Sequence, residues 1–120
     1  MNIANKIIKT EEVNWKELKW FQGKLKKHNK EQIERLKKSL IKNNFFMQFF
    51  VWQEDENNIW ILDGHHRKLA LEELQKENYN IPERLPATFL DVKDKKEAYK
   101  KEIKCLNRNI DVMKLIRESN

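Results

Sequence analysis

The stretch IWILDGHHRKLAL, residues 59–71, decides the fold predicted for this chain. An apolar run ends in Asp63-Gly64, and an amphipathic segment begins immediately after the glycine. This pattern predicts a buried strand, a tight turn and a helix in direct succession. Glycine suits the turn because it has no Cβ, so that another backbone segment or a ligand can come close.

The first turn of the expected helix carries His65, His66 and Arg67. The N–H groups of such a turn point out of the helix and attract anions. Arg67 adds a planar set of donors that matches phosphate or carboxylate. The stretch therefore predicts a phosphate-binding corner. The alternative is an ordinary solvated helix terminus, in which Arg67 pairs internally with an acid such as Asp63 or Asp91.

The composition predicts one small domain with a modest core. Of the 120 residues, 39% are apolar and 37% are charged, and we expect a single domain over residues 15–120. No run approaches the roughly 18 apolar residues that a membrane span needs, and no signal-peptide core is found at the N-terminus. A single cysteine, Cys105, leaves no internal disulfide within this sequence. These features favour a cytoplasmic protein without a membrane partner.

Positive charge is concentrated in residues 16–42, which hold ten of the 25 Lys and Arg residues but three of the 19 Asp and Glu residues. Such an excess indicates an anionic partner, and we expect weak, sequence-independent binding to DNA. The alternative is a lysine-rich surface that is simply solvated. The side chains expected to contact DNA are Lys24, Lys26, Lys27, Lys37 and Lys38.

The first part of the chain has weaker patterns. Residues 1–14 are expected to form a flexible lead-in, residues 15–21 a short strand or extended segment, and residues 22–27 a basic loop. A helix should begin after Asn29 and end at Asn43-Asn44, because asparagine tolerates the left-handed backbone that ends many helices. Its apolar face is predicted to comprise Ile33, Leu36, Leu40 and Ile41.

The second part predicts a sheet. Residues 49–52 and 59–62 are apolar runs around a polar turn, so we expect a β-hairpin. Residues 87–90 predict another strand, and further helices should follow Asp94 and Asp111. Short strands interrupted by helices predict a compact α+β domain, a small mixed sheet packed with helices. The helix after Gly64 should bury Ala70, Leu71 and Leu74.

From residue 15 to about residue 107 the chain resembles the ParB/sulfiredoxin-like superfamily. Gly64, Arg67 and Ala70 match its signature Gly-x-x-Arg-x-x-Ala. The resemblance is greatest to the small ParB-like domains of phages and mobile elements, also labelled ParB-like nucleases, that accompany DNA methyltransferases. Asn44 and Gln48 replace a glycine and a proline usual in that branch. Other matching pieces are WKEL at 15–18, FQG at 21–23, FFVW at 49–52, LDGH at 62–65 and LPA at 85–87.

The resemblance implies that the corner at Gly64 binds the phosphates of a nucleotide. That corner holds CTP in partition ParB proteins, ATP in sulfiredoxin and an adenine nucleotide in a free-serine kinase branch. We therefore expect CTP, ATP or ADP, or a simple phosphate, as the ligand; a metal is not implied. The residues expected to bind it are Asp63, Gly64, His65, His66, Arg67, Gln22, Lys24, Lys26 and Asn107.

Some positions depart from these relatives. His65 stands where sulfiredoxin has its cysteine, so sulfiredoxin activity is not expected. His66 and Arg67 stand where ParB has paired arginines, and a further ParB arginine is missing. Asn107 matches the asparagine of ParB's second nucleotide motif, but Leu106 replaces its acidic neighbour. The clamp for a triphosphate is therefore incomplete.

Three functions remain open. The first is a phosphate- or nucleotide-binding module in the DNA metabolism of a phage or mobile element, with DNA and a DNA methyltransferase as candidate partners. The second is a nucleotide-dependent enzyme, an NTP hydrolase, kinase or nuclease. Catalysis would need an acid near the phosphate, and Asp63 is the only acid in the motif. The third is a protein-interaction domain with a vestigial phosphate site.

Two expectations concern the histidines. His65 and His66 are adjacent, so they point about 100° apart on a helix and do not favour one shared metal ion. We therefore predict no metal site. A histidine at the corner should titrate near its ordinary pKa, so anion affinity should rise as the pH falls through roughly 6.5.

Overall fold

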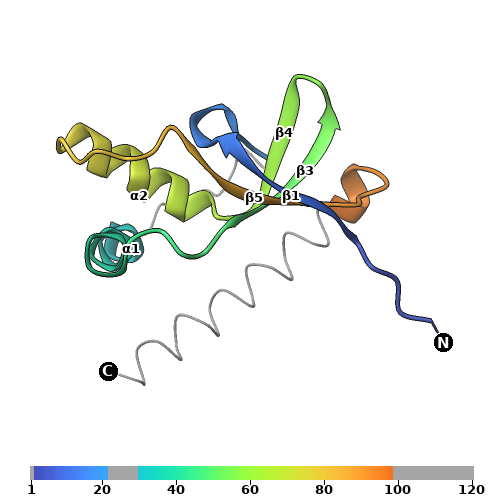
Figure 1. Cartoon of the computed structure of the whole chain (residues 1–120), viewed down its shortest axis with the longest axis horizontal. Helices are drawn as coiled ribbons and strands as arrows, with labels where there is room; N and C mark the ends of the chain where they lie inside the picture. Colours follow the sequence, from blue (N-terminus) through green and yellow to red (C-terminus); the bar gives the residue numbers. More distant parts are fainter. Residues whose placement is uncertain (1, 22–29, 99–120) are drawn as a thin grey trace.

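The computed structural model describes residues 2–21 and 30–98, which form a five-stranded mixed β-sheet with helices packed against it (Figure 1). The strand order is β1-β5-β3-β4-β2. The α+β fold expected from the sequence is confirmed. Along the chain the elements are β1 (Ile7–Asn14), the 3-10 helix η1 (Trp15–Glu17), β2 (Lys19–Trp20), α1 (Lys30–Asn43), β3 (Phe49–Asp55), β4 (Asn58–Asp63), α2 (His65–Lys76) and β5 (Arg84–Leu90).

Strands β3 and β4 form the expected hairpin. They pair antiparallel, with Val51 opposite Ile61, and the Asn57 N–H donates to Asp55 Oδ1 at 2.8 Å in the turn. Each strand of the hairpin has a parallel neighbour on its outer side. Strand β5 is parallel to β3, and β2 is parallel to β4. Helix α2 therefore leaves the end of β4 and returns the chain to β5, on the other side of β3.

For residues 7–14, strand β1 corrects the expectation that residues 1–14 form a flexible lead-in. It pairs antiparallel with β5 at the edge of the sheet, from Ile7 opposite Leu90 to Asn14 opposite Arg84. The sequence pattern concealed this strand because Val13 is its one buried residue. An edge strand that is exposed on both faces shows no alternation of apolar and polar residues.

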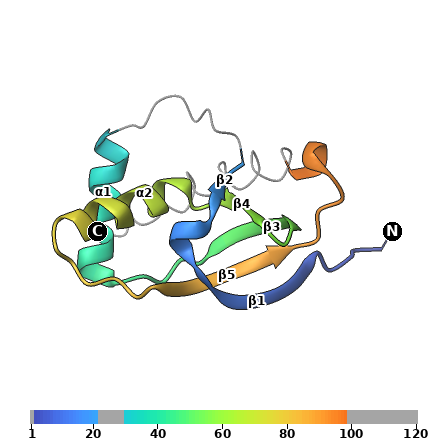
Figure 2. The same ribbon diagram turned by 90° about the horizontal axis from the view of Figure 1, so that it is seen from above.

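Helices α1 and α2 lie together at one end of the sheet (Figures 1 and 2). Helix α1 ends where the sequence predicts, since Asn44 follows it with a φ of 63°. On its predicted apolar face Ile33 is buried and Leu36 and Leu40 are half-buried, but Ile41 is exposed. The assignment of Ile41 to this face was wrong, because the buried face of α1 is centred on Ile33 and Lys37. The expected N-cap, residue 29, lies outside the described residues.

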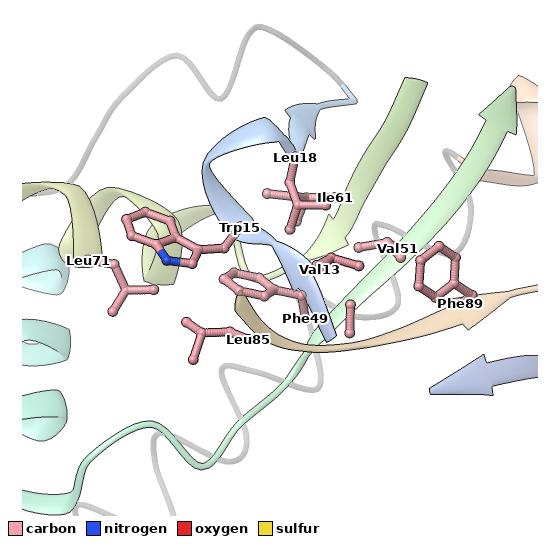
Figure 3. Packing of buried hydrophobic residues seen from close by; sticks show 10 residues of the cluster. Val13, Trp15, Leu18, Phe49, Val51, Ile61, Leu71, Leu85 and Phe89 are labelled. Atoms are coloured by element: carbon pink, nitrogen blue, oxygen red, sulfur yellow. The ribbon is translucent and has the colours of Figure 1, made fainter. Parts of the chain in front are cut away.

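A cluster of buried apolar side chains joins η1, the sheet and α2 (Figure 3). Trp15 is fully buried within it, and its Nε1 donates to Pro82 O at 2.9 Å, so the polar end of the ring is satisfied. The three inward positions predicted for α2 are all buried. The cluster consists of Val13, Trp15, Leu18, Phe49, Val51, Ile61, Leu71, Leu85, Ala87 and Phe89.

The last described residues begin the helix expected after Asp94. The Glu97 N–H donates to Asp94 Oδ1 at 2.9 Å, as at an N-cap, and Ala98 packs with Trp52 and Leu62 in a second apolar cluster. The rest of this helix and the helix expected after Asp111 lie outside the described residues. Within residues 2–21 and 30–98, no helix has the length and apolar character needed to cross a bilayer.

Candidate functional site

Gly64 forms the corner between β4 and α2. Its φ is 118°, in the left-handed region, and it is the N-cap of α2. A Cβ here would lie 2.5 Å from Phe49 Cδ1, so any other residue would be strained and crowded. The first hydrogen bond of the helix runs from the Lys68 N–H to Gly64 O at 2.9 Å. The strand, glycine and helix predicted by the sequence are thus in place.

The first turn of α2 contains no acidic residue, and Gly64 provides no side-chain cap. A helix N-terminus carries partial positive charge, and its first N–H groups point along the helix axis. Of the three predicted side chains on this turn, His66 is half-buried, whereas His65 and Arg67 are buried. An anion at this turn would therefore meet the backbone and His66 before it met the buried side chains of His65 and Arg67.

The Arg67 side chain points into the protein. Its Nη2 lies 3.1 Å from Asp63 Oδ1, and its Nη1 donates to Met47 O at 2.6 Å and to Gln48 O at 3.2 Å. Both Arg67 and Asp63 are buried, with 6% and 1% of their surface exposed. The guanidinium group therefore faces internal acceptors, which favours internal pairing of Arg67 over the expectation that its side chain closes a phosphate site. Asp63, and not Asp91, is the acid with which Arg67 pairs.

His65 is buried at the start of α2, where its ring meets Trp20 edge-on with 5.2 Å between ring centroids. Burial, followed by the nearby charges of His66, Lys68 and Arg67, lowers the pKa of His65 from its ordinary value of 6.5 to about 4. His65 is therefore neutral at physiological pH. This corrects, for His65, the expectation of a histidine that titrates near 6.5 and strengthens anion binding.

Lys68 is a buried cation near the corner that sequence reasoning missed. Its Nζ donates to Leu18 O at 2.8 Å and lies 3.5 Å from Glu72 Oε1. The hydrogen bond from Lys68 to Leu18 O links α2 to the residue that precedes β2. It therefore holds in position the segment that leads toward residue 22. The one signal in the sequence was the spacing of Lys68 and Glu72, four residues apart on a helix.

The other residues predicted for the nucleotide lie outside the described residues. They are Gln22, Lys24, Lys26 and Asn107. The same holds for Lys27 among the residues predicted to contact DNA.

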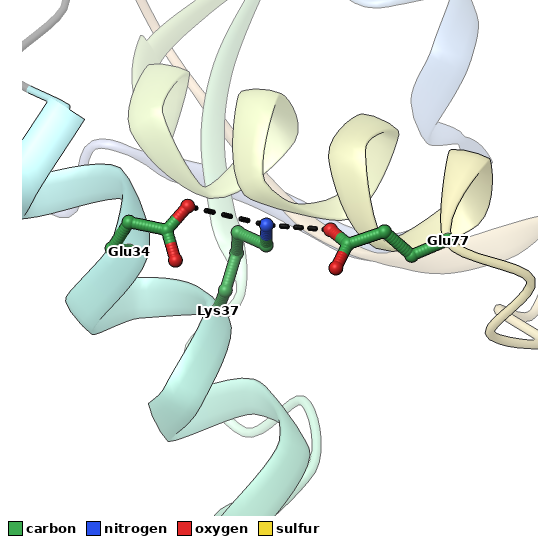
Figure 4. A network of polar contacts seen from close by, with 3 residues as sticks. All are labelled: Glu34, Lys37 and Glu77. Carbon is green, nitrogen blue, oxygen red and sulfur yellow. Dashed lines mark hydrogen bonds and ion pairs between the residues drawn. The ribbon is translucent and has the colours of Figure 1, made fainter.

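Lys37 and Lys38, both predicted to contact DNA, have different surroundings. Lys37 is buried between α1 and α2, with its Nζ 2.5 Å from Glu77 Oε2 and 3.3 Å from Glu34 Oε1 (Figure 4). The hydrogen bond to Glu77 raises the pKa of Lys37 above its ordinary value. Lys38 is exposed. The structure thus corrects the expectation for Lys37, because two carboxylates already hold its ammonium group, and leaves Lys38 able to meet a polyanion.

Two further features bear on function. Within residues 2–21 and 30–98, no three His, Cys, Asp or Glu side chains come together as metal ligands.

An apolar hollow of about 430 Å³ lies apart from the Gly64 corner. It is lined by Leu40, Ile41, Asn44, Phe45, Leu71, Leu74, Tyr79, Asn80, Ile81, Pro82, Leu85 and Pro86.

Comparison with known proteins finds a similar fold. No protein-family model matches the chain, and no curated protein matches its sequence. Among solved structures, the chain is similar to the C-terminally truncated chromosome-partitioning protein ParB from Caulobacter crescentus, complexed with CTP-gamma-S. The TM-score is 0.61 at 14% sequence identity, over 79% of this chain and 51% of the ParB chain. The chain thus spans about half the length of that structure, and what the two share is the ParB-like α+β fold.

Proposed function

We propose that this chain is a phosphate- or nucleotide-binding module in DNA metabolism, and that it holds the anion at the N-terminal turn of α2. The observation that carries the proposal is the corner at Gly64, where a left-handed glycine presents a helix start that has no acidic residue. Backbone N–H groups at such a start bind phosphate. The fold adds support, since the similar ParB structure was determined with CTP-gamma-S.

Under this proposal the residues of the corner divide into two groups. The N–H groups of His65, His66 and Arg67 face the anion, while the Arg67 side chain and Asp63 hold the corner in shape from behind. Asp63 adds little repulsion toward an anion because its charge is paired. The other side of the site is proposed to be closed by Gln22, Lys24, Lys26 and Asn107.

A charge substitution at the first turn tests the site. The substitution His66→Glu places a negative charge at the proposed anion site, and the same charge suits a helix N-terminus, so the fold should be retained. We expect calorimetry to show affinity for CTP, ATP, ADP or inorganic phosphate in the unmodified chain, and a loss of about tenfold or more in His66→Glu.

The matched control is Gln75→Glu, which adds the same charge near the other end of α2. This variant should bind the ligand as the unmodified chain does. Absence of heat with all four ligands in the unmodified chain would contradict the proposed function. If His66→Glu and Gln75→Glu bound the phosphate ligand with equal affinity, the binding site would have to lie elsewhere than at the α2 N-terminus.

Binding to DNA belongs to the same proposal. The proposed contacts are Lys24, Lys26, Lys27 and Lys38, with affinity that falls steeply as salt rises because phosphate contacts release counterions. Replacing Lys24, Lys26 and Lys27 by Glu should abolish binding to duplex and single-stranded DNA at low salt.

The role in a phage or mobile element, with a DNA methyltransferase as partner, would be supported by an adjacent methyltransferase gene. A metabolic operon would favour a nucleotide-dependent enzyme.

A second candidate function is that of a protein-interaction domain with a vestigial phosphate site. It is favoured by the internal pairing of Arg67 and by the apolar hollow beside α1 and α2. Exposed apolar surface of this kind is typical of sites that bind other proteins. The calorimetry above separates the two functions, because this candidate predicts no heat with any of the four phosphate ligands.

A further inference from the structure

Strand β1 presents an open edge of the sheet (Figure 2). It is eight residues long and pairs with β5 on one side; among the described residues, no strand pairs with its other side. An edge strand of this length carries a row of N–H and C=O groups that can pair with another strand.

The hydrogen-bonding pattern shows which residues of β1 face outward. Glu12 lies opposite Pro86, which has no N–H to donate. The Glu12 carbonyl accepts instead from the Arg84 side chain at 2.6 Å, so no backbone N–H of the opposite residue bonds to it, and we infer that Glu12 faces away from β5. Outward-facing residues alternate along an antiparallel strand. Thr10, two residues before Glu12, therefore also directs its N–H and C=O groups outward.

The charges next to Thr10 select one partner and one register. We propose that β1 pairs antiparallel with β1 of a second copy of this chain, with Thr10 opposite Thr10 on the twofold axis. This register places Lys9 of each copy opposite Glu11 of the other. A shift to the neighbouring register on one side would put Lys9 opposite Lys9, and a shift to the other side would put Glu11 opposite Glu11. Like charges directly opposite destabilise paired strands.

Apart from the Glu12 carbonyl, which already accepts from Arg84 Nη2, the groups that meet in the dimer give up only weak contacts. Lys9 Nζ now lies 3.0 Å from Glu11 Oε2 within the same strand and 4.6 Å from the centre of the Phe89 ring. The Lys9 and Glu11 side chains are about half exposed, and exposed contacts of this kind are weak. The exposed side chains of Ile7 and Ile8 would lie at the joined edge and lose water. Two copies would then share one continuous sheet with twofold symmetry, which is the commonest symmetry of soluble oligomers.

This inference does not depend on the proposed function. Two strands, β5 and β3, separate β1 from β4 and the Gly64 corner in the sheet, so the pairing leaves the corner open. A dimer could therefore form whether or not the chain binds a phosphate.

Charge-swap variants test the pairing by sedimentation equilibrium over a range of concentrations. We expect the unmodified chain to dimerise, and Lys9→Glu and Glu11→Lys each to weaken the dimer about tenfold or more, because each places like charges opposite one another twice. An equimolar mixture of the two variants should form a mixed dimer, and the double variant Lys9→Glu/Glu11→Lys should dimerise again. Circular dichroism of each variant serves as the control for folding.

Amide hydrogen exchange gives a second, independent reading. The Thr10 N–H should become protected only at concentrations where the dimer forms, whereas the Lys9 and Glu11 amides, which face β5, should be protected at all concentrations. A chain that stays monomeric at millimolar concentration would overturn the inference. A dimer that is insensitive to both single variants would overturn it equally.

Discussion

The two ends of α2 are each held by a pair of opposite charges, and the two pairs differ in burial. At the N-terminal end, Arg67 and Asp63 are 3.1 Å apart with 8% and 1% of their side chains exposed. At the C-terminal end, Lys37 and Glu77 are 2.5 Å apart, but the Glu77 side chain is 51% exposed. A buried charge that loses its partner is costly, whereas an exposed one is taken up by water. The N-terminal end should therefore be the sensitive one.

Removing the Arg67 charge should have the largest effect. Arg67→Met removes the positive charge beside the buried Asp63 carboxylate and the donor to the carbonyl groups of Met47 and Gln48. We expect the free energy of unfolding, measured with denaturant, to fall by about 3–5 kcal/mol. The double variant Asp63→Asn/Arg67→Met should lose less than the sum of the two single variants, because no unpaired charge remains. A loss well under 1 kcal/mol in Arg67→Met would refute the description of a buried brace.

The pH dependence of stability should show a smaller effect at the same end. The pKa of His65 is about 4 in the folded chain and near 6.5 when unfolded. The unfolded chain therefore takes up a proton first, so the contribution of His65 is complete above pH 6.5 and is lost as the pH falls toward 4. By pH 5 the loss should reach about 2 kcal/mol.

The matched variant for this test is His65→Asn, which cannot titrate. Denaturant unfolding between pH 7 and pH 5 should show a flatter decline in stability for this variant than for the unmodified chain. Parallel declines in the two proteins would show that the low pKa of His65 is not the cause.

The C-terminal pair should give the smallest effect. Lys37→Met removes the contacts with Glu34 and Glu77 but leaves both acids within reach of water. We expect a small fall in melting temperature that shrinks at high salt, because salt screens such pairs. Lys38→Met, one residue along α1 and exposed, is the control and should not change the melting temperature. If Lys37→Met lowered the melting temperature as much as Arg67→Met does, the two ends of α2 would not differ in sensitivity.

Sequence reasoning found the elements that carry a strong local signal. The hairpin of β3 and β4, the Gly64 corner and the buried face of α2 all follow from runs of apolar residues and from a glycine at the turn. It missed β1, because that strand is formed by pairing with a distant part of the chain, and almost all of its side chains face water. Only the backbone pairing with β5 defines it as a strand.

The direction of charged side chains could not be read from the sequence. Arg67 stands at a position that suits a phosphate, yet the approach of Met47 and Gln48 supplies internal acceptors that no local pattern reveals. Lys37 belongs to a basic segment, yet Glu77, forty residues later, turns it into a link between two helices. In both cases the partner is brought close by the tertiary fold, so spacing along the chain gives no warning.

Whether the N-terminal turn of α2 binds an anion is best tested by an NMR titration of backbone amides. Phosphate, and then CTP, is added at constant ionic strength, with chloride as the reference anion. We expect saturable chemical-shift changes that are largest at the amides of His65, His66 and Arg67, while the amide signals at the other end of α2, near Glu77, do not shift. Shifts that never saturate, or that appear only on the lysine-rich surface of α1, would contradict an anion site at the Gly64 corner.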